Sequence, residues 1–65
     1  GIATRDVLKL ADDLPAGQRA VIRSMFLDGH DTRRTAEALA MSEGAVRVAL
    51  HRGLKGLADK LRGTV

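Results

Sequence analysis

Apolar residues recur along this chain at the spacing of helices and not at the alternation of strands. Across residues 15–27 the apolar positions follow i, i+1, i+4 and i+5, which share one helical face: Val21, Ile22, Met25 and Phe26. Shorter apolar groups predict helices over residues 4–12 and 32–40, the latter with Ala36 and Leu39 inward. The pattern therefore predicts an all-α fold.

A fourth and longer helix is predicted over residues 43–61, with a core-facing side and a mostly cationic side. At 100° per residue the core side carries Val46, Leu50, Gly53, Leu54, Leu57 and Leu61. The opposite side carries Gly44, Val48, His51, Arg52, Lys55, Asp59 and Arg62, with Arg47 at its flank. Gly53 and Gly56 each cost about 1 kcal/mol in a helix interior, which indicates close packing, a bend or an earlier helix end.

Turn and cap residues separate these helices. Leu14-Pro15 divides the first two helices because proline suits the first helical position, and Asp28-Gly29 ends the second. Asp31 or Thr32 is expected to cap the third helix and Ser42 the fourth. Only Ala40-Met41-Ser42 joins the last two helices, so the chain predicts a small four-helix bundle with a helix-turn-helix over residues 31–62.

The composition fits one small domain, covering residues 1–65, and indicates no catalytic, metal or cofactor site. The chain has 65 residues and no cysteine, and Phe26, expected in the core with Met25 and Met41, is its one aromatic residue. Ser24 and Ser42 have no histidine at the spacing of a catalytic triad, and His30 fits a turn. No apolar run is long enough to span a membrane, and no signal peptide is visible, so we expect a cytoplasmic protein.

The positive charge lies in the second half of the chain. Residues 32–65 carry seven basic and three acidic groups, a net +4, whereas residues 1–31 carry a net −1 and the whole chain +3. Clustered positive charge favours an acidic partner, most commonly nucleic acid. A chain with one aromatic residue lacks the stacking platform that single strands need, which favours duplex DNA.

The residues expected to contact DNA lie on the last two helices. Side chains of the fourth helix are expected to reach base edges or phosphates in the major groove, the start of that helix to hold a phosphate, and two arginines of the third helix to grip phosphates. The set is Arg33, Arg34, Ser42, Gly44, Arg47, Val48, His51, Arg52 and Lys55.

The same stretch resembles region 4 of the bacterial sigma-70 family, in particular its extracytoplasmic-function group. The resemblance covers about residues 14–61. It rests on Leu14-Pro15 with Arg19, Asp28-Gly29, Ala36-Glu37, Leu39, Met41-Ser42, Gly44, Val46-Arg47 and Leu50-His51-Arg52-Gly53. It implies a domain that binds the −35 promoter element, docks on the flap of the RNA polymerase β subunit and is controlled by an anti-sigma factor.

The chain departs from the pattern of that family at six positions. Members usually have glutamate at Arg34, an aliphatic residue at Thr35 and glycine at Ala40. They commonly have threonine, serine and arginine where this chain has Ala45, Val48 and Ala49. The last three departures remove polar groups from the helix expected to face DNA.

Two other interpretations remain open at this point. The first is the DNA-binding domain of a response-regulator-type transcription factor, which shares a four-helix pattern; Leu14-Pro15 and His51-Arg52-Gly53 favour the sigma interpretation. The second is a helical protein-interaction module that has lost DNA binding, motivated by Ala45, Val48 and Ala49. An enzyme is disfavoured because no catalytic pair can be assembled.

Overall fold

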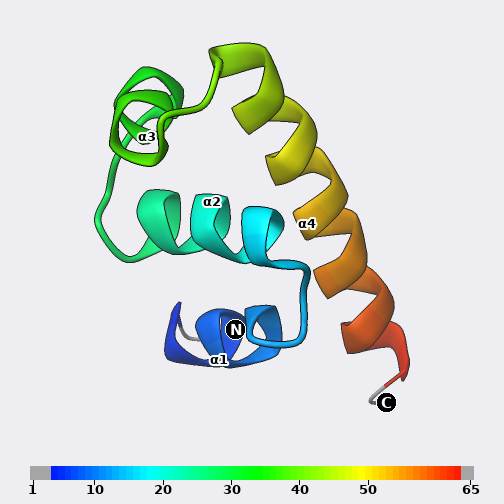
Figure 1. Cartoon of the computed structure of the whole chain (residues 1–65). Helices are drawn as coiled ribbons and strands as arrows, with labels where there is room; N and C mark the ends of the chain where they lie inside the picture. Colours follow the sequence, from blue (N-terminus) through cyan, green and yellow to red (C-terminus); the bar gives the residue numbers. More distant parts are fainter. Residues whose placement is uncertain (1–3, 64–65) are drawn as a thin grey trace.

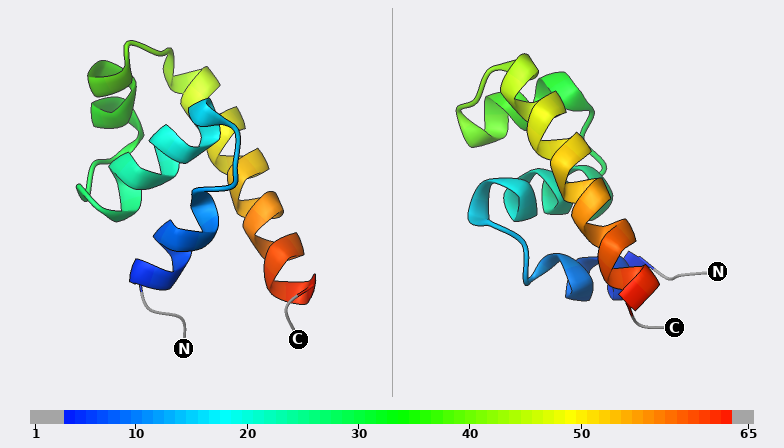
Figure 2. Two further views of the ribbon diagram at one scale, coloured as in Figure 1. Left: turned by 60° about the horizontal axis from the view of Figure 1, so that its bottom comes forward. Right: turned by 90° about the vertical axis from the view of Figure 1, so that its right-hand side faces the viewer.

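The computed structural model describes residues 4–63, which form four helices and no strand (Figure 1). These are α1 (Thr4–Ala11), α2 (Ala16–Phe26), α3 (Thr32–Leu39) and α4 (Glu43–Gly63). The all-α prediction is confirmed. Helix α4 runs the length of the molecule and packs against each of the other three helices (Figures 1 and 2).

The helix boundaries agree with the cap signals, with two corrections. Asp31 Oδ1 accepts the Arg34 N–H at 2.8 Å and caps α3, and Ser42 Oγ accepts the Ala45 N–H at 3.0 Å and caps α4. Pro15 has an extended backbone (φ −52°, ψ 149°), so it precedes α2 and is not its first helical residue. Helix α4 continues to Gly63, past the expected end at residue 61, because neither glycine in its interior stops it.

Two apolar clusters hold the helices together. The α1-side cluster consists of Ala11, Leu14, Ile22 and Leu57. The α3-side cluster consists of Val21, Ala36 and Val46, with Met25, Leu39 and Met41 packed against it. Leu50 of α4 contacts both clusters and joins them into one core.

The two glycines inside α4 are sites of close helix packing. A Cβ added at Gly53 would lie 2.7 Å from Ile22 Cδ1, and one at Gly56 would lie 2.8 Å from Leu14 Cδ2. Both distances are far shorter than carbon–carbon contact. Of the three explanations that the sequence left open, close packing is therefore correct, and α2 and the turn before it lie tightly against α4.

Two residues expected in the core are exposed. Leu54 is 43% exposed and belongs to neither cluster, because the other helices cover the side of α4 that carries Val46 and Leu57, and Leu54 lies at its edge. Phe26 is 45% exposed, because it is the last residue of α2 and follows exposed Arg23 by one turn on the same side.

A buried polar cluster lies between α2 and α3. Ser24 and Thr35 are both buried, and their hydroxyl oxygens are 3.1 Å apart. The Ser24 hydroxyl also lies 3.2 Å from Nδ1 of His30, in the loop that joins the two helices. His30 is thus more than the turn residue that the sequence indicated, and the buried Thr35 hydroxyl has a polar partner.

Ala40 ends α3 in the left-handed region, with φ 55° and ψ 43°. A residue with a Cβ loses about 1–2 kcal/mol of stability in this conformation, and glycine avoids that loss. Part of the gain is offset because glycine raises the conformational entropy of the unfolded chain. We therefore expect Ala40→Gly to raise the free energy of unfolding by about 0.5–1 kcal/mol and the thermal midpoint by a few degrees. Thermal denaturation followed by circular dichroism measures this.

Ala58→Gly is the matched control for this substitution. Ala58 is exposed inside α4, where glycine should lower stability by about 1 kcal/mol. Equal losses in the two variants would contradict the strain assigned to Ala40.

Candidate nucleic-acid interface

A tight turn sets the angle between α3 and α4. After Ala40, the Met41 N–H donates to the Ala36 carbonyl at 2.9 Å, and the Met41 side chain packs half-buried against the α3-side cluster. Ser42 then caps α4. Helix α3, this turn and α4 form the expected helix-turn-helix arrangement, with both helices fixed by backbone hydrogen bonds and by the core (Figure 1).

Six residues of the predicted DNA-binding set share one exposed face of α4, called here the α4 outer face. Val48 lies near its centre, because Val48 and buried Leu57 are nine residues apart, about two and a half turns, and so point in opposite directions. The α4 outer face consists of Gly44, Arg47, Val48, His51, Arg52 and Lys55, all of which are exposed.

The cations of the α4 outer face keep their charge uncompensated. Within residues 4–63, Arg47, Arg52 and Lys55 take part in no ion pair. Nearer the end of the helix, Arg62 pairs with Asp59, and the Lys60 ammonium lies 3.1 Å from the Asp13 carboxylate. The cations of the α4 outer face therefore lie nearer the turn than Lys60 and Arg62, which are paired with carboxylates.

The arginines at the start of α3 form a second, separate group. Arg33 and Arg34 are both exposed. The Arg33 Nε lies 3.5 Å from Glu37 Oε1, an exposed pair of small energetic value, whereas Arg34 makes no ion pair among the described residues. Arg34 is therefore the member of this pair with the more available charge.

The start of α4 is a poorer anion site than its sequence suggested. The Ser42 hydroxyl occupies the Ala45 N–H, one of the first-turn donors that a phosphate would use. The Glu43 carboxylate adds negative charge at the same end. Ser42 thus has a structural role as a cap, and the positive charge nearby comes from arginine side chains.

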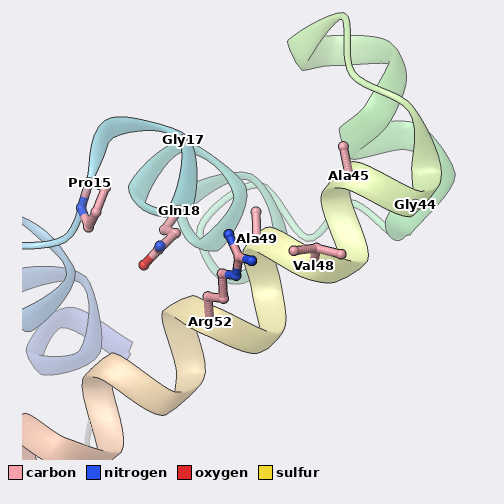
Figure 3. A pocket seen from close by; sticks show the side chains of 8 residues that line it. All are labelled: Pro15, Gly17, Gln18, Gly44, Ala45, Val48, Ala49 and Arg52. Carbon is pink, nitrogen blue, oxygen red and sulfur yellow. The ribbon is translucent and has the colours of Figure 1, made fainter.

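A groove next to the α4 outer face was not foreseen from the sequence. It encloses about 400 Å³ between the start of α2 and the first half of α4 (Figure 3). No local pattern signals it, because its two walls are distant in sequence and are brought together by the packing of α2 on α4. Its lining includes Pro15 just before α2, Gln18 from α2, and Ala45, Val48, Ala49 and Arg52 from α4.

Neither a metal-binding cluster nor a membrane-spanning helix is found within residues 4–63. No three His, Asp or Glu side chains among residues 4–63 lie close enough together to hold a metal ion. None of the described helices has the length and apolar character needed to cross a membrane.

A small helix-turn-helix bundle with an exposed cationic face on its last helix is a nucleic-acid-binding type of domain. Comparison with known families identifies which one: residues 4–57 match the family described as sigma-70, region 4. The chain belongs to this family.

The curated relatives of the chain are sigma factors of the extracytoplasmic-function (ECF) group. It is 42% identical over 53 residues to the ECF RNA polymerase sigma factor SigX of Bacillus subtilis, a match that covers 82% of this chain and 27% of SigX. It is 41% identical over 49 residues to SigF of Caulobacter vibrioides, covering 75% of this chain and 27% of SigF. The chain thus spans about a quarter of the length of these relatives. No solved structure matches it significantly.

Proposed function

We propose that this chain is the promoter-recognition domain of an ECF sigma factor and that it binds the −35 element of duplex DNA. Helix α4 enters the major groove with the α4 outer face toward the base edges. Helix α3 crosses the DNA backbone, with Arg34, and Arg33 after release from Glu37, on phosphates. Sigma-70 region 4 membership and the ECF sigma factors among its relatives support promoter recognition.

One observation carries the DNA-binding part of this proposal. Arg47 and Arg52 in the first half of α4, and Lys55 just past its middle, are exposed and have no ion pair within residues 4–63, and α4 directly follows a tight turn. An α-helix fits the major groove, arginine binds guanine or phosphate, and each cation that neutralises a phosphate releases counterions. A helix-turn-helix places the N-terminal half of its second helix on the bases, and Arg47 and Arg52 lie in this half.

The proposal includes two protein partners and a compartment. In the full-length protein the domain docks on the flap of the RNA polymerase β subunit, and an anti-sigma factor controls its availability in the bacterial cytoplasm. Phe26 and Leu27, 45% and 56% exposed at the end of α2, offer apolar surface for such contacts. A pull-down of the isolated β flap with the chain, repeated with Leu27→Asp, tests the polymerase contact separately from DNA binding.

Duplex binding is tested by titrating the chain into a labelled library of duplexes at two salt concentrations. The expected result is enrichment of a short motif and an affinity that falls steeply as salt rises. Absence of salt-dependent binding to any duplex would contradict the proposal.

Lys55 is expected to act on phosphate and not on bases, because it is the last cation of the α4 outer face. Lys55→Ala should weaken binding equally for all sequences and reduce the slope of log affinity against log salt by about one unit. Lys9→Ala is the matched control, because Lys9 is an exposed residue of α1, and it should leave the slope unchanged. A loss that depended on the base sequence would show that Lys55 reads bases.

A protein-interaction module without DNA binding is the second candidate, and the apolar residues near DNA favour it. Ala45 and Val48 are exposed where polar contacts to bases would be made. This candidate requires binding to the β flap or to an anti-sigma factor together with no salt-sensitive affinity for any duplex. The response-regulator alternative is not carried further, because the family match is to sigma-70 region 4.

A further inference from the structure

We propose that Val48 reads thymine, so that the DNA sequence selected by this domain contains a thymine whose C5-methyl group packs against the Val48 side chain. The inference rests on the proposed function, since it requires α4 in the major groove. It assigns a base to Val48, the one apolar side chain of a face whose other residues are three cations, His51 and Gly44.

The position of Val48 on α4 is the first observation that supports a contact between Val48 and thymine. Its side chain is 50% exposed although it is apolar, and it lies near the centre of the α4 outer face, opposite buried Leu57. It belongs to neither core cluster. The fold therefore gains little from a valine at this point.

The surroundings of Val48 form an apolar shelf. Ala45 lies one turn before both Val48 and Ala49 on α4, and all three residues line the groove beside α2 (Figure 3). Ala49 is half-buried against the α3-side cluster, which fixes this side of the shelf. In the view of Figure 3 the Arg52 guanidinium ends beside Ala49, on the side away from Val48.

The chemistry of the major groove selects one base for such a shelf. Thymine alone among the four standard bases presents a methyl group there, and the other bases present hydrogen-bond donors or acceptors. Those groups would lose water against Val48 and gain no partner. Valine is also stiff in a helix, with one strongly preferred rotamer, so it offers a fixed surface to a methyl group.

The charges around the shelf explain why DNA, and not an apolar partner, binds there. Arg47 and Arg52 flank Val48 on either side of the α4 outer face, and neither has an ion pair among residues 4–63. A purely apolar partner would have to desolvate both guanidinium groups. The polyanionic duplex compensates them and at the same time brings a methyl group to Val48.

The test removes only the methyl group. After a motif has been selected from the duplex library, each thymine in it is replaced in turn by deoxyuridine, which keeps the base pair and lacks the C5-methyl. For the unaltered chain, one replacement should weaken binding about fourfold, the effect of one methyl-sized group removed from water. For Val48→Ser the same replacement should have no effect. This variant should fold, because half of the valine side chain is already in solvent, and circular dichroism checks that it does.

Each outcome bears on a distinct claim. Failure of the chain to bind any duplex in a salt-dependent manner overturns the proposed function and this inference with it. Selective binding to a motif without thymine, or with thymines that tolerate deoxyuridine, overturns this inference alone. A deoxyuridine penalty that persists undiminished in Val48→Ser removes Val48 as the reader, and Ala45→Ser, made in parallel, then tests the neighbouring position on the shelf.

Discussion

Replacing Gly53 with valine is expected to lower the free energy of unfolding by about 2–3 kcal/mol, the upper range for overpacking a core. A Cβ alone would lie 2.7 Å from Ile22 Cδ1 and 3.4 Å from Ile22 Cγ1, and valine adds two methyl groups beyond it. Ile22 is fully buried, so its side chain can give way only by displacing its neighbours in the core. The gain in helix propensity over glycine, about 0.5 kcal/mol, is too small to offset this clash.

The loss is large for a chain of 65 residues, since small domains are stabilised by only a few kcal/mol. The thermal midpoint should fall by roughly 10–20 °C. Gly63→Val is the matched control on the same helix, because an added Cβ at Gly63 meets nothing within 4 Å. If both variants melted together, the contact between α2 and α4 would not be as close as described.

Arg52→Ala is expected to weaken binding to the selected duplex by about 1–3 kcal/mol, or roughly 5- to 150-fold. Arg52 is exposed, has no ion pair among residues 4–63 and extends over the groove between α4 and α2 (Figure 3). Its guanidinium is free to fork onto the O6 and N7 atoms of a guanine. The loss should therefore concentrate at one base pair of the motif, and titration against single-substitution duplexes measures it.

Arg62→Ala provides the comparison, because Arg62 lies ten residues further along α4, about 15 Å away, and already pairs with Asp59. Its removal should change affinity little and without regard to sequence. A uniform loss in Arg52→Ala would assign Arg52 to a phosphate, and unchanged binding would remove it from the interface.

Most of the helix boundaries could be predicted because their causes are local. Asp31 and Ser42 accept hydrogen bonds from the first turns of their helices, and Gly29 takes the positive φ of 73° that the turn after α2 requires. The exposed face of α4 was predictable for a similar reason, since helical periodicity alone decides which side chains oppose Val46 and Leu57.

The remaining features depend on contacts between distant segments. Phe26 and Leu54 are apolar at nearly the right spacing, and only the lengths and crossings of the neighbouring helices leave them exposed. The groove beside Val48 exists because Pro15 and Gln18 approach α4, which no local pattern encodes. The pairing of Ser24 with Thr35 likewise requires that α3 fold back on α2.

That buried pair limits how α3 can sit in the molecule. An interface made only of Val21, Ala36 and Leu39 would tolerate small rotations of α3 with little change in buried area. The hydroxyls of Ser24 and Thr35 meet at 3.1 Å in one arrangement, and every buried side-chain polar atom of the described residues has a partner there. Any other rotation would take the buried Thr35 hydroxyl away from Ser24 and leave Ser24 with His30 as its partner. Two small hydroxyls therefore select the orientation of α3, and through the short turn they also select the direction in which α4 leaves it.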